Sequence, residues 1–148
     1  MSDQVKRTIA SLAATILGST IYLLKILSMQ QSGRLKLTER LSDWGSVILI
    51  LIGFLIVFQI IIHIVLHIVN RIVTNEDMPD LTDELDKLIE LKTMQFAYWT
   101  FLAGFGAGLV TMVAGEPIWV MFAITTCSLV FSGIVGDLAK LIMYKRGG

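Results

Sequence analysis

The run Trp44–Val73 constrains this chain most, because it is an almost unbroken series of Ile, Leu, Val and Phe residues. An apolar stretch of ~20 residues is long enough to cross the hydrocarbon core of a bilayer as a helix. The run therefore predicts a membrane-spanning helix. Polar side chains interrupt its second half: Gln59, His63, His67, Asn70 and Arg71. Such groups are costly to place in lipid, so they are the first candidates for a functional role.

The composition extends this prediction to the whole chain. Of its 148 residues, 55% are hydrophobic and only 16% are charged, whereas soluble domains average about 25% charged residues. Four segments reach the length of a span: residues 8–29, 44–73, 95–114 and 118–144. We therefore expect an all-α fold, a polytopic transmembrane four-helix bundle that forms one membrane domain over residues 1–148.

Charge bears on partners and on orientation. The formal net charge is +0 at pH 7, which gives no case for nucleic acid as a partner and leaves the lipid bilayer as the expected surroundings. With four spans, both termini and the connector 74–94 share one side, and that side holds most of the Lys and Arg residues. Because basic residues gather on the cytoplasmic side, we expect both termini to be cytoplasmic. The lone cysteine, Cys127, is expected to be a small buried hydrophobe.

Small residues recur at helical spacing in spans three and four. The run Ala103–Gly108 places Gly104 and Gly108 one turn apart, and span four continues the pattern with Ser128, Ser132 and Gly136. Helices in membranes pack through such faces, because apolar burial gives no advantage in lipid. These residues predict close helix contacts. The pattern leaves open whether the contacts lie within one chain or between chains.

The connector 74–94 is the clearly water-exposed segment. Pro79 and Asp80 resemble a helix start, and the apolar residues that follow have amphipathic spacing, so a charged amphipathic helix is expected to extend span three. Its charged positions are Asp83, Glu84, Asp86, Lys87, Glu90 and Lys92. The acids lack the spacing of a calcium-binding loop, which favours a solvated helix face over a metal site. A docking surface for a basic partner is the other alternative.

The same connector carries a motif. Residues 83–92 read Asp-Glu-Leu-Asp-Lys-Leu-Ile-Glu-Leu-Lys, Tyr98-Trp99 and a Gly-rich span follow, and the chain ends in Tyr144-Lys145-Arg146-Gly147-Gly148. These features resemble a family of small four-span bacterial membrane proteins, whose members read Asp-Glu-Arg-Asp-Arg-x-Ile-Glu-x-Arg at this place and end in Tyr-Arg-Arg-Gly. Leu85 replaces the usual arginine. The family has no settled function, so the resemblance implies four spans in a bacterial cytoplasmic (inner) membrane and implies no activity.

The polar residues of the spans predict a layer within the membrane. Gln59, His63 and His67 are spaced four apart, so they share one face of their helix. His63 and Asp137 are equally far along the chain from the basic residues Arg71 and Lys145, about 12 Å at the helical rise. Thr15 and Thr100 are equally far from the basic residues Arg7 and Lys92, so we expect them at the same depth in the membrane. A lone carboxylate at that depth needs a partner or water, and His63 is the expected partner of Asp137.

Three interpretations of this layer stay open. It could pass or sense protons, because histidine titrates near neutral pH. His63 and His67, one turn apart, could ligate a metal or, with more difficulty, haem. The polar groups could instead form structural hydrogen bonds between helices. No catalytic triad, phosphate loop or zinc-protease motif is present, so we expect no enzymatic activity and predict no cofactor.

The leading hypothesis is a non-enzymatic membrane protein that acts through helix–helix contacts, as a homo-oligomer or as a subunit of a larger complex. The alternative is a small oligomeric ion channel or proton-coupled transporter that uses the His/Asp layer.

Overall fold

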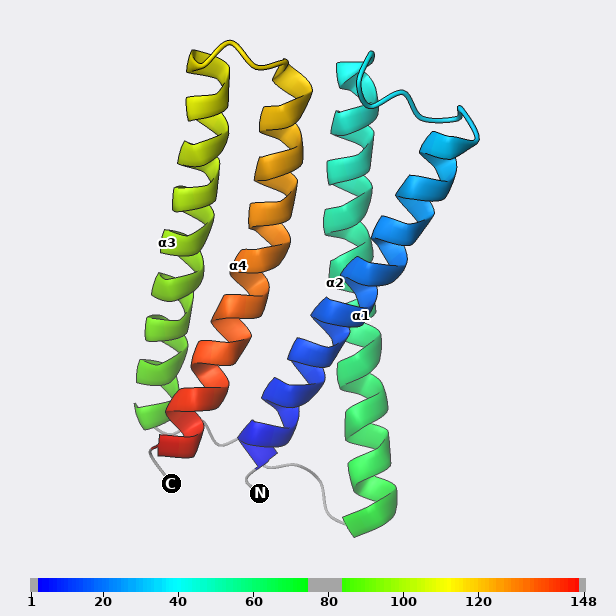
Figure 1. Ribbon diagram of the computed structural model, residues 1–148. Coiled ribbons are helices and arrows are strands. Elements are labelled where there is room, and N and C mark those ends of the chain that lie inside the picture. The colour runs from blue at the N-terminus through cyan, green and yellow to red at the C-terminus, as the bar shows by residue number, and fades with distance from the viewer. Residues whose placement is uncertain (1–2, 75–83, 147–148) are drawn as a thin grey trace.

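The computed structural model describes residues 3–74 and 84–146, and within these ranges all regular structure is helical. The four helices are α1 (Asp3–Gln31), α2 (Leu41–Thr74), α3 (Glu84–Val113) and α4 (Ile118–Arg146) (Figure 1). Each is long and apolar enough to cross a membrane. The predicted all-α fold with four transmembrane helices is confirmed, and the protein is a multi-pass membrane protein.

The helices extend beyond the apolar spans because charged residues at their ends favour further turns. α3 runs without a break from the acidic connector into span three, as predicted, with Glu84 and Asp86 in its first turn. α2 and α4 end with basic residues in their last turns, Arg71 in the first case and Lys145 and Arg146 in the second. Acids at the N-terminus and bases at the C-terminus both complement the helix dipole. The predicted helix start at Pro79 and Asp80 lies outside the described residues.

Glycine ends two of the helices. Gly33 follows α1 with φ 73° and Gly115 follows α3 with φ 82°. After α1 the amide of Arg34 donates to the Met29 carbonyl at 3.0 Å, and after α3 the amide of Glu116 donates to the Thr111 carbonyl at 3.0 Å. This left-handed closure satisfies carbonyls that the helix leaves unpaired. Both turns lie at the end of the molecule opposite the termini, which we call the loop end (Figure 1).

The α1–α2 loop folds back onto its own helices. The amide of Lys36 donates to Asp43 Oδ2 at 2.8 Å, and Trp44 Nε1 donates to the Leu37 carbonyl at 2.7 Å. The Trp44 ring stacks on Phe122 of α4, with centroids 6.3 Å apart. Leu37, Trp44 and Val47 form a small buried apolar core. This core attaches the α1–α2 hairpin to the loop end of α4.

The helices form an open bundle. α3 packs against α4, α4 packs against α1, and α1 packs against α2, whereas α2 touches α4 only slightly. Among the described helices, the backbone of α3 comes close to α4 alone. α1 leans, so that it lies near α4 at the end of the termini and diverges from it toward the loop end (Figure 1). Large apolar side chains stay exposed along all four helices, as lipid-facing surfaces require.

Candidate intramembrane polar site

A chain of side-chain hydrogen bonds joins three helices. Ser11 of α1 donates its hydroxyl to Asp137 Oδ2 of α4 at 2.9 Å. Gln59 of α2 donates its amide Nε2–H to the Ser11 hydroxyl oxygen. All three residues are half-buried. We call Gln59, Ser11 and Asp137 the polar cluster, and its connectivity gives the predicted carboxylate a hydrogen-bond donor inside the membrane domain.

Small residues on the facing helices allow the short Ser11 side chain to reach both partners. One turn along α1, Thr15 faces Gly133 of α4, where an added Cβ would lie 3.7 Å from Thr15 Cγ2. On the α2 side, a Cβ at Gly18 would lie 3.0 Å from Phe58 Cδ1. The backbones therefore approach closely on both sides of α1, which is how membrane helices bring polar side chains into contact.

His63 is not the direct partner of Asp137 that the sequence predicted. Its ring is exposed, and Nδ1 lies 2.9 Å from the Gln59 carbonyl of its own helix. Because a carbonyl only accepts, Nδ1 carries the proton in this contact. His63 does lie close enough to Asp137 for an electrostatic interaction. The direct donor to the carboxylate is Ser11, whereas the His63 ring bonds a carbonyl of its own helix.

The two threonines and His67 of the predicted polar site also bond or lie elsewhere than at Asp137. Thr15 donates to the Ser11 carbonyl within α1 at 3.1 Å, and Thr100 donates to the Phe96 carbonyl within α3 at 2.8 Å. Thr100 is separated from the cluster because, among the described helices, the α3 backbone lies close to that of α4 alone. His67 is exposed on α2.

Residue counting chose the wrong partners because the helix ends are not level. The C-terminal end of α2 extends beyond the neighbouring helix ends (Figure 1). Counting from Arg71 therefore placed His63, rather than Gln59, level with Asp137. The predicted layer did not include Ser11. Its spacing from Thr15 was the available signal, since both lie on one face of α1.

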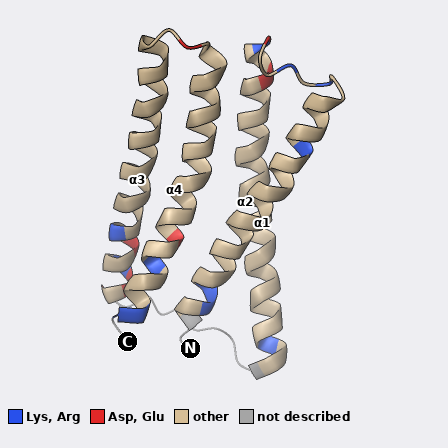
Figure 2. Ribbon diagram, viewed as in Figure 1, with Lys and Arg blue, Asp and Glu red and all other residues tan. Residues whose placement is uncertain are grey.

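Charged residues gather mostly toward the ends of the helices and leave a long uncharged middle (Figure 2). At the end of the molecule that holds the termini, Asp86 of α3 lies close to side chains of α1 and α4. Gln4 of α1 donates to Asp86 Oδ2 at 3.2 Å, and the Tyr144 hydroxyl of α4 lies near the same carboxylate. Among the predicted connector residues, four others are exposed: Glu84, Lys87, Glu90 and Lys92. Asp83 lies outside the described residues.

Metal ligands do not gather in the described ranges. Within residues 3–74 and 84–146, no three His, Cys, Asp or Glu side chains come together as a metal ion would require. His63 and His67 by themselves supply two ligands, which is fewer than zinc takes.

The glycine face of α3 is occupied by α4 of the same chain. A Cβ at Gly104 would overlap the Ser128 side chain, and one at Gly108 would lie 3.3 Å from Met121 Cγ. On α4, a Cβ at Gly136 would lie 3.3 Å from Ala97 Cβ. The buried Ser132 hydroxyl donates to the Leu129 carbonyl of its own helix at 2.8 Å. The question left open by the sequence is thereby answered for these positions, whose close contacts lie within the chain.

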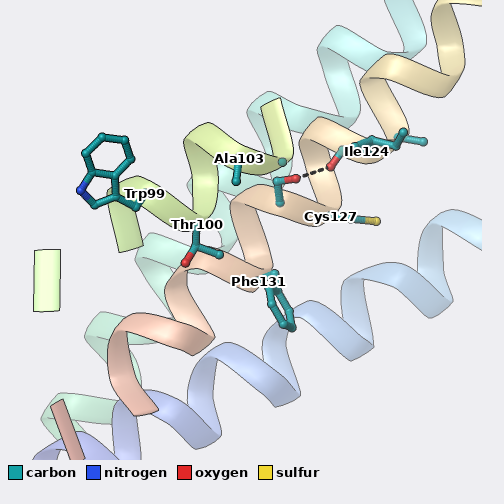
Figure 3. A pocket seen from close by; sticks show the side chains of 9 residues that line it. Trp99, Thr100, Ala103, Ile124, Cys127 and Phe131 are labelled. Carbon is teal, nitrogen blue, oxygen red and sulfur yellow. Dashed lines mark hydrogen bonds between the residues drawn. The ribbon is translucent and has the colours of Figure 1, made fainter. Parts of the chain in front are cut away.

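Two hollows open on the sides of α4. The α3/α4 groove has a volume of about 800 Å³, with Trp99, Thr100 and Ala103 on its α3 side and Cys127 and Phe131 on its α4 side (Figure 3). The α1/α4 crevice has a volume of about 450 Å³ and is lined by α1, α2 and α4. Cys127 lines both hollows and is exposed, so the expectation that it is buried was wrong.

Comparison with protein-family models, with curated proteins and with solved structures finds no match. The resemblance of residues 83–92 to small four-span bacterial membrane proteins therefore stays a prediction. The candidate functional features of the described residues are the polar cluster, the α3/α4 groove and the α1/α4 crevice.

Proposed function

We propose that this is a non-enzymatic protein of the bacterial cytoplasmic membrane, with both termini cytoplasmic, that acts through helix–helix contacts. It works as a homo-oligomer or as a subunit of a larger membrane complex. The observation that carries the proposal is the open side of α3, whose backbone has no helix but α4 beside it among the described residues.

The association surface on this side is the exposed small-residue face next to the α3/α4 groove. Ala103 and Ala107 lie one turn apart on α3, and both are exposed. An added Cβ at Gly106 would meet nothing within 4 Å. Helix association in lipid depends on close packing rather than on apolar burial, so an exposed face of small side chains favours a further helix. Gly104 and Gly108 do not serve this purpose because α4 already covers them.

The test is to enlarge this face and measure association. We expect Ala103→Leu combined with Ala107→Leu to reduce cross-linking between copies, or recovery of a co-purifying membrane protein, at least fivefold. The matched control is Ala13→Leu, which places the same side chain at an exposed position of α1. A protein that is monomeric in membranes and recovers no partner contradicts the proposal, as does association that the α3 double variant leaves unchanged.

The second candidate function is ion or proton-coupled transport, which the polar cluster favours. Asp137, Ser11 and Gln59 form a hydrogen-bonded chain across three helices, and His63 lies one turn beyond Gln59 on α2. Intramembrane carboxylates and histidines recur in proton relays. One copy encloses little space around the cluster, so conduction needs several copies or a moving α1.

Flux in liposomes tests this candidate. Asp137→Asn keeps the acceptor oxygen but removes the charge, so it is expected to abolish a proton-dependent flux. Thr20→Ala is the control, because that hydroxyl is exposed and bonds only its own helix at the Ile16 carbonyl. Absence of any pH- or ion-dependent flux, or flux that survives Asp137→Asn, contradicts the candidate.

A further inference from the structure

The α1/α4 crevice is a groove with three apolar walls. α1 contributes Leu23 and Leu27, α4 contributes Val130 and Ile134, and α2 closes the back with Val47 and Leu51. The fourth side is open, because α1 leans away from α4 toward the loop end (Figure 1). Protein interiors do not leave such space empty, since the lining atoms would lose their contacts. In a bilayer, the chain of a lipid is the apolar material at hand.

The crevice has the length of one leaflet. Along α1 its lining runs from Ser19 to Gln30, about 16 Å at the helical rise, and half of a hydrocarbon core is about 15 Å. It is closed at its inner end, where Thr15 meets Gly133 and Ser11 bonds Asp137. A chain that enters through the open side therefore ends near the middle of the membrane. This geometry fits one chain from one leaflet.

The loop that borders the crevice carries basic residues. Leu37 and Thr38 of the α1–α2 loop line the crevice, and the same loop holds Arg34, Lys36 and Arg40, part of which shows as blue segments at the loop end in Figure 2. Two acids lie nearby. Glu39 pairs with Lys36 Nζ at 3.2 Å, and Asp43 accepts the Lys36 amide. The three basic residues outnumber these two acids, so the loop keeps a net positive charge, and guanidinium groups bind phosphate in paired geometry.

We infer that the α1/α4 crevice is a phospholipid site, in which one acyl chain fills the groove and the phosphate binds at the Arg34–Arg40 loop. A lipid gains no apolar burial when its chain moves from the bilayer into the protein. Its preference for the crevice over the surrounding bilayer therefore comes from the basic loop and from the packing of the three walls around the chain. The site is independent of the association surface on α3 and of transport through the polar cluster.

Native mass spectrometry of the full chain in a sugar-based detergent tests the site, with phosphatidylglycerol added as the probe. Leu23→Trp fills the crevice, and Ile21→Trp is the matched control, because Ile21 is similarly exposed on the same helix but does not line the crevice. We expect Leu23→Trp to weaken lipid binding at least tenfold and Ile21→Trp to leave it unchanged. Arg34→Gln with Arg40→Gln should weaken it several-fold. Glycerol phosphate, which lacks chains, should not compete.

A second measurement does not depend on a bulky substitution. In a Cys127→Ser, Val130→Cys variant the thiol lines the crevice alone; bound phosphatidylglycerol should slow its reaction with a lipid-soluble maleimide several-fold, and adding Arg34→Gln with Arg40→Gln should remove that protection. Equal lipid binding by wild type and Leu23→Trp overturns the inference. So does competition by glycerol phosphate, which would indicate a site for phosphate alone. A dimer without lipid that Leu23→Trp dissociates also overturns it, because the occupant would then be a second copy.

Discussion

Replacing Gly104 with alanine probes the contact that holds α3 on α4. The new Cβ would overlap both Oγ and Cβ of Ser128. The Oγ could rotate away, but a Cβ is fixed to its backbone, so the two helices must separate. Among the described helices, the α3 backbone lies close to α4 alone. Moving α3 away from α4 would therefore weaken the whole α3–α4 hairpin. We therefore expect Gly104→Ala to destabilise the protein.

The magnitude follows from two opposing effects. Overpacking a tight contact costs about 1–3 kcal/mol, and the upper end applies here because the overlap includes a backbone-attached atom. Alanine gains about 1 kcal/mol over glycine in helix propensity. The expected net loss is about 2 kcal/mol, roughly 30-fold in the unfolding equilibrium. Gly106→Ala supplies the matched control on the same helix, because its Cβ would meet nothing within 4 Å, and it should be neutral or slightly stabilising.

Reversible unfolding in mixed micelles, followed by circular dichroism, measures both variants. Ser128→Gly removes the obstructing atoms, so Gly104→Ala in that background should cost nothing. The double-mutant cycle then gives a coupling of about 2 kcal/mol, within the range for residues in contact.

The reasoning is refuted if Gly104→Ala is as stable as Gly106→Ala. It is also refuted if Ser128→Gly gives no relief, because the cost would then arise elsewhere than at this contact.

Three further substitutions test other contacts by thermal unfolding. Ser11→Ala removes the donor to Asp137 and should lower the free energy of unfolding by about 1–2 kcal/mol. Thr20→Ala is the control and should have little effect. Equal stabilities of the two variants would mean that the polar cluster does not stabilise the helix contacts. Trp44→Phe keeps an aromatic ring against Phe122 but leaves the buried Leu37 carbonyl without its hydrogen-bond donor. We expect a loss of about 1–3 kcal/mol in the free energy of unfolding. The control is Trp99→Phe at an exposed position, which should cost less than about 0.5 kcal/mol. Gly115→Ala places a side chain on a residue with φ 82° and should lower the free energy of unfolding by about 1–2 kcal/mol. Gly45→Ala, whose Cβ would have open space around it, should not destabilise the protein. A neutral effect of Gly115→Ala would contradict the backbone strain expected at this position.

Residue type and spacing alone predicted the secondary structure. Apolar runs of sufficient length predicted four helices, because lipid leaves a segment such as 44–73 few other ways to satisfy its backbone. The acidic residues within the connector predicted that α3 begins before its apolar part, and Glu84 is its first described residue. Gly104 and Gly108 were predicted as close-contact positions, and α4 lies against both. These features depend on neighbours along the chain, which the sequence displays directly.

The tertiary structure decided which of these faces meet. The lean of α1 and the extra length of α2 cannot be read from hydropathy, because tilt is set by packing against neighbouring helices. Those two features brought Ser11 and Gln59, rather than His63, to Asp137. They also opened the α1/α4 crevice. The amino-acid sequence determined what each helix is and where it lies along the chain, whereas relative height and rotation, which depend on contacts between distant residues, determined the sites.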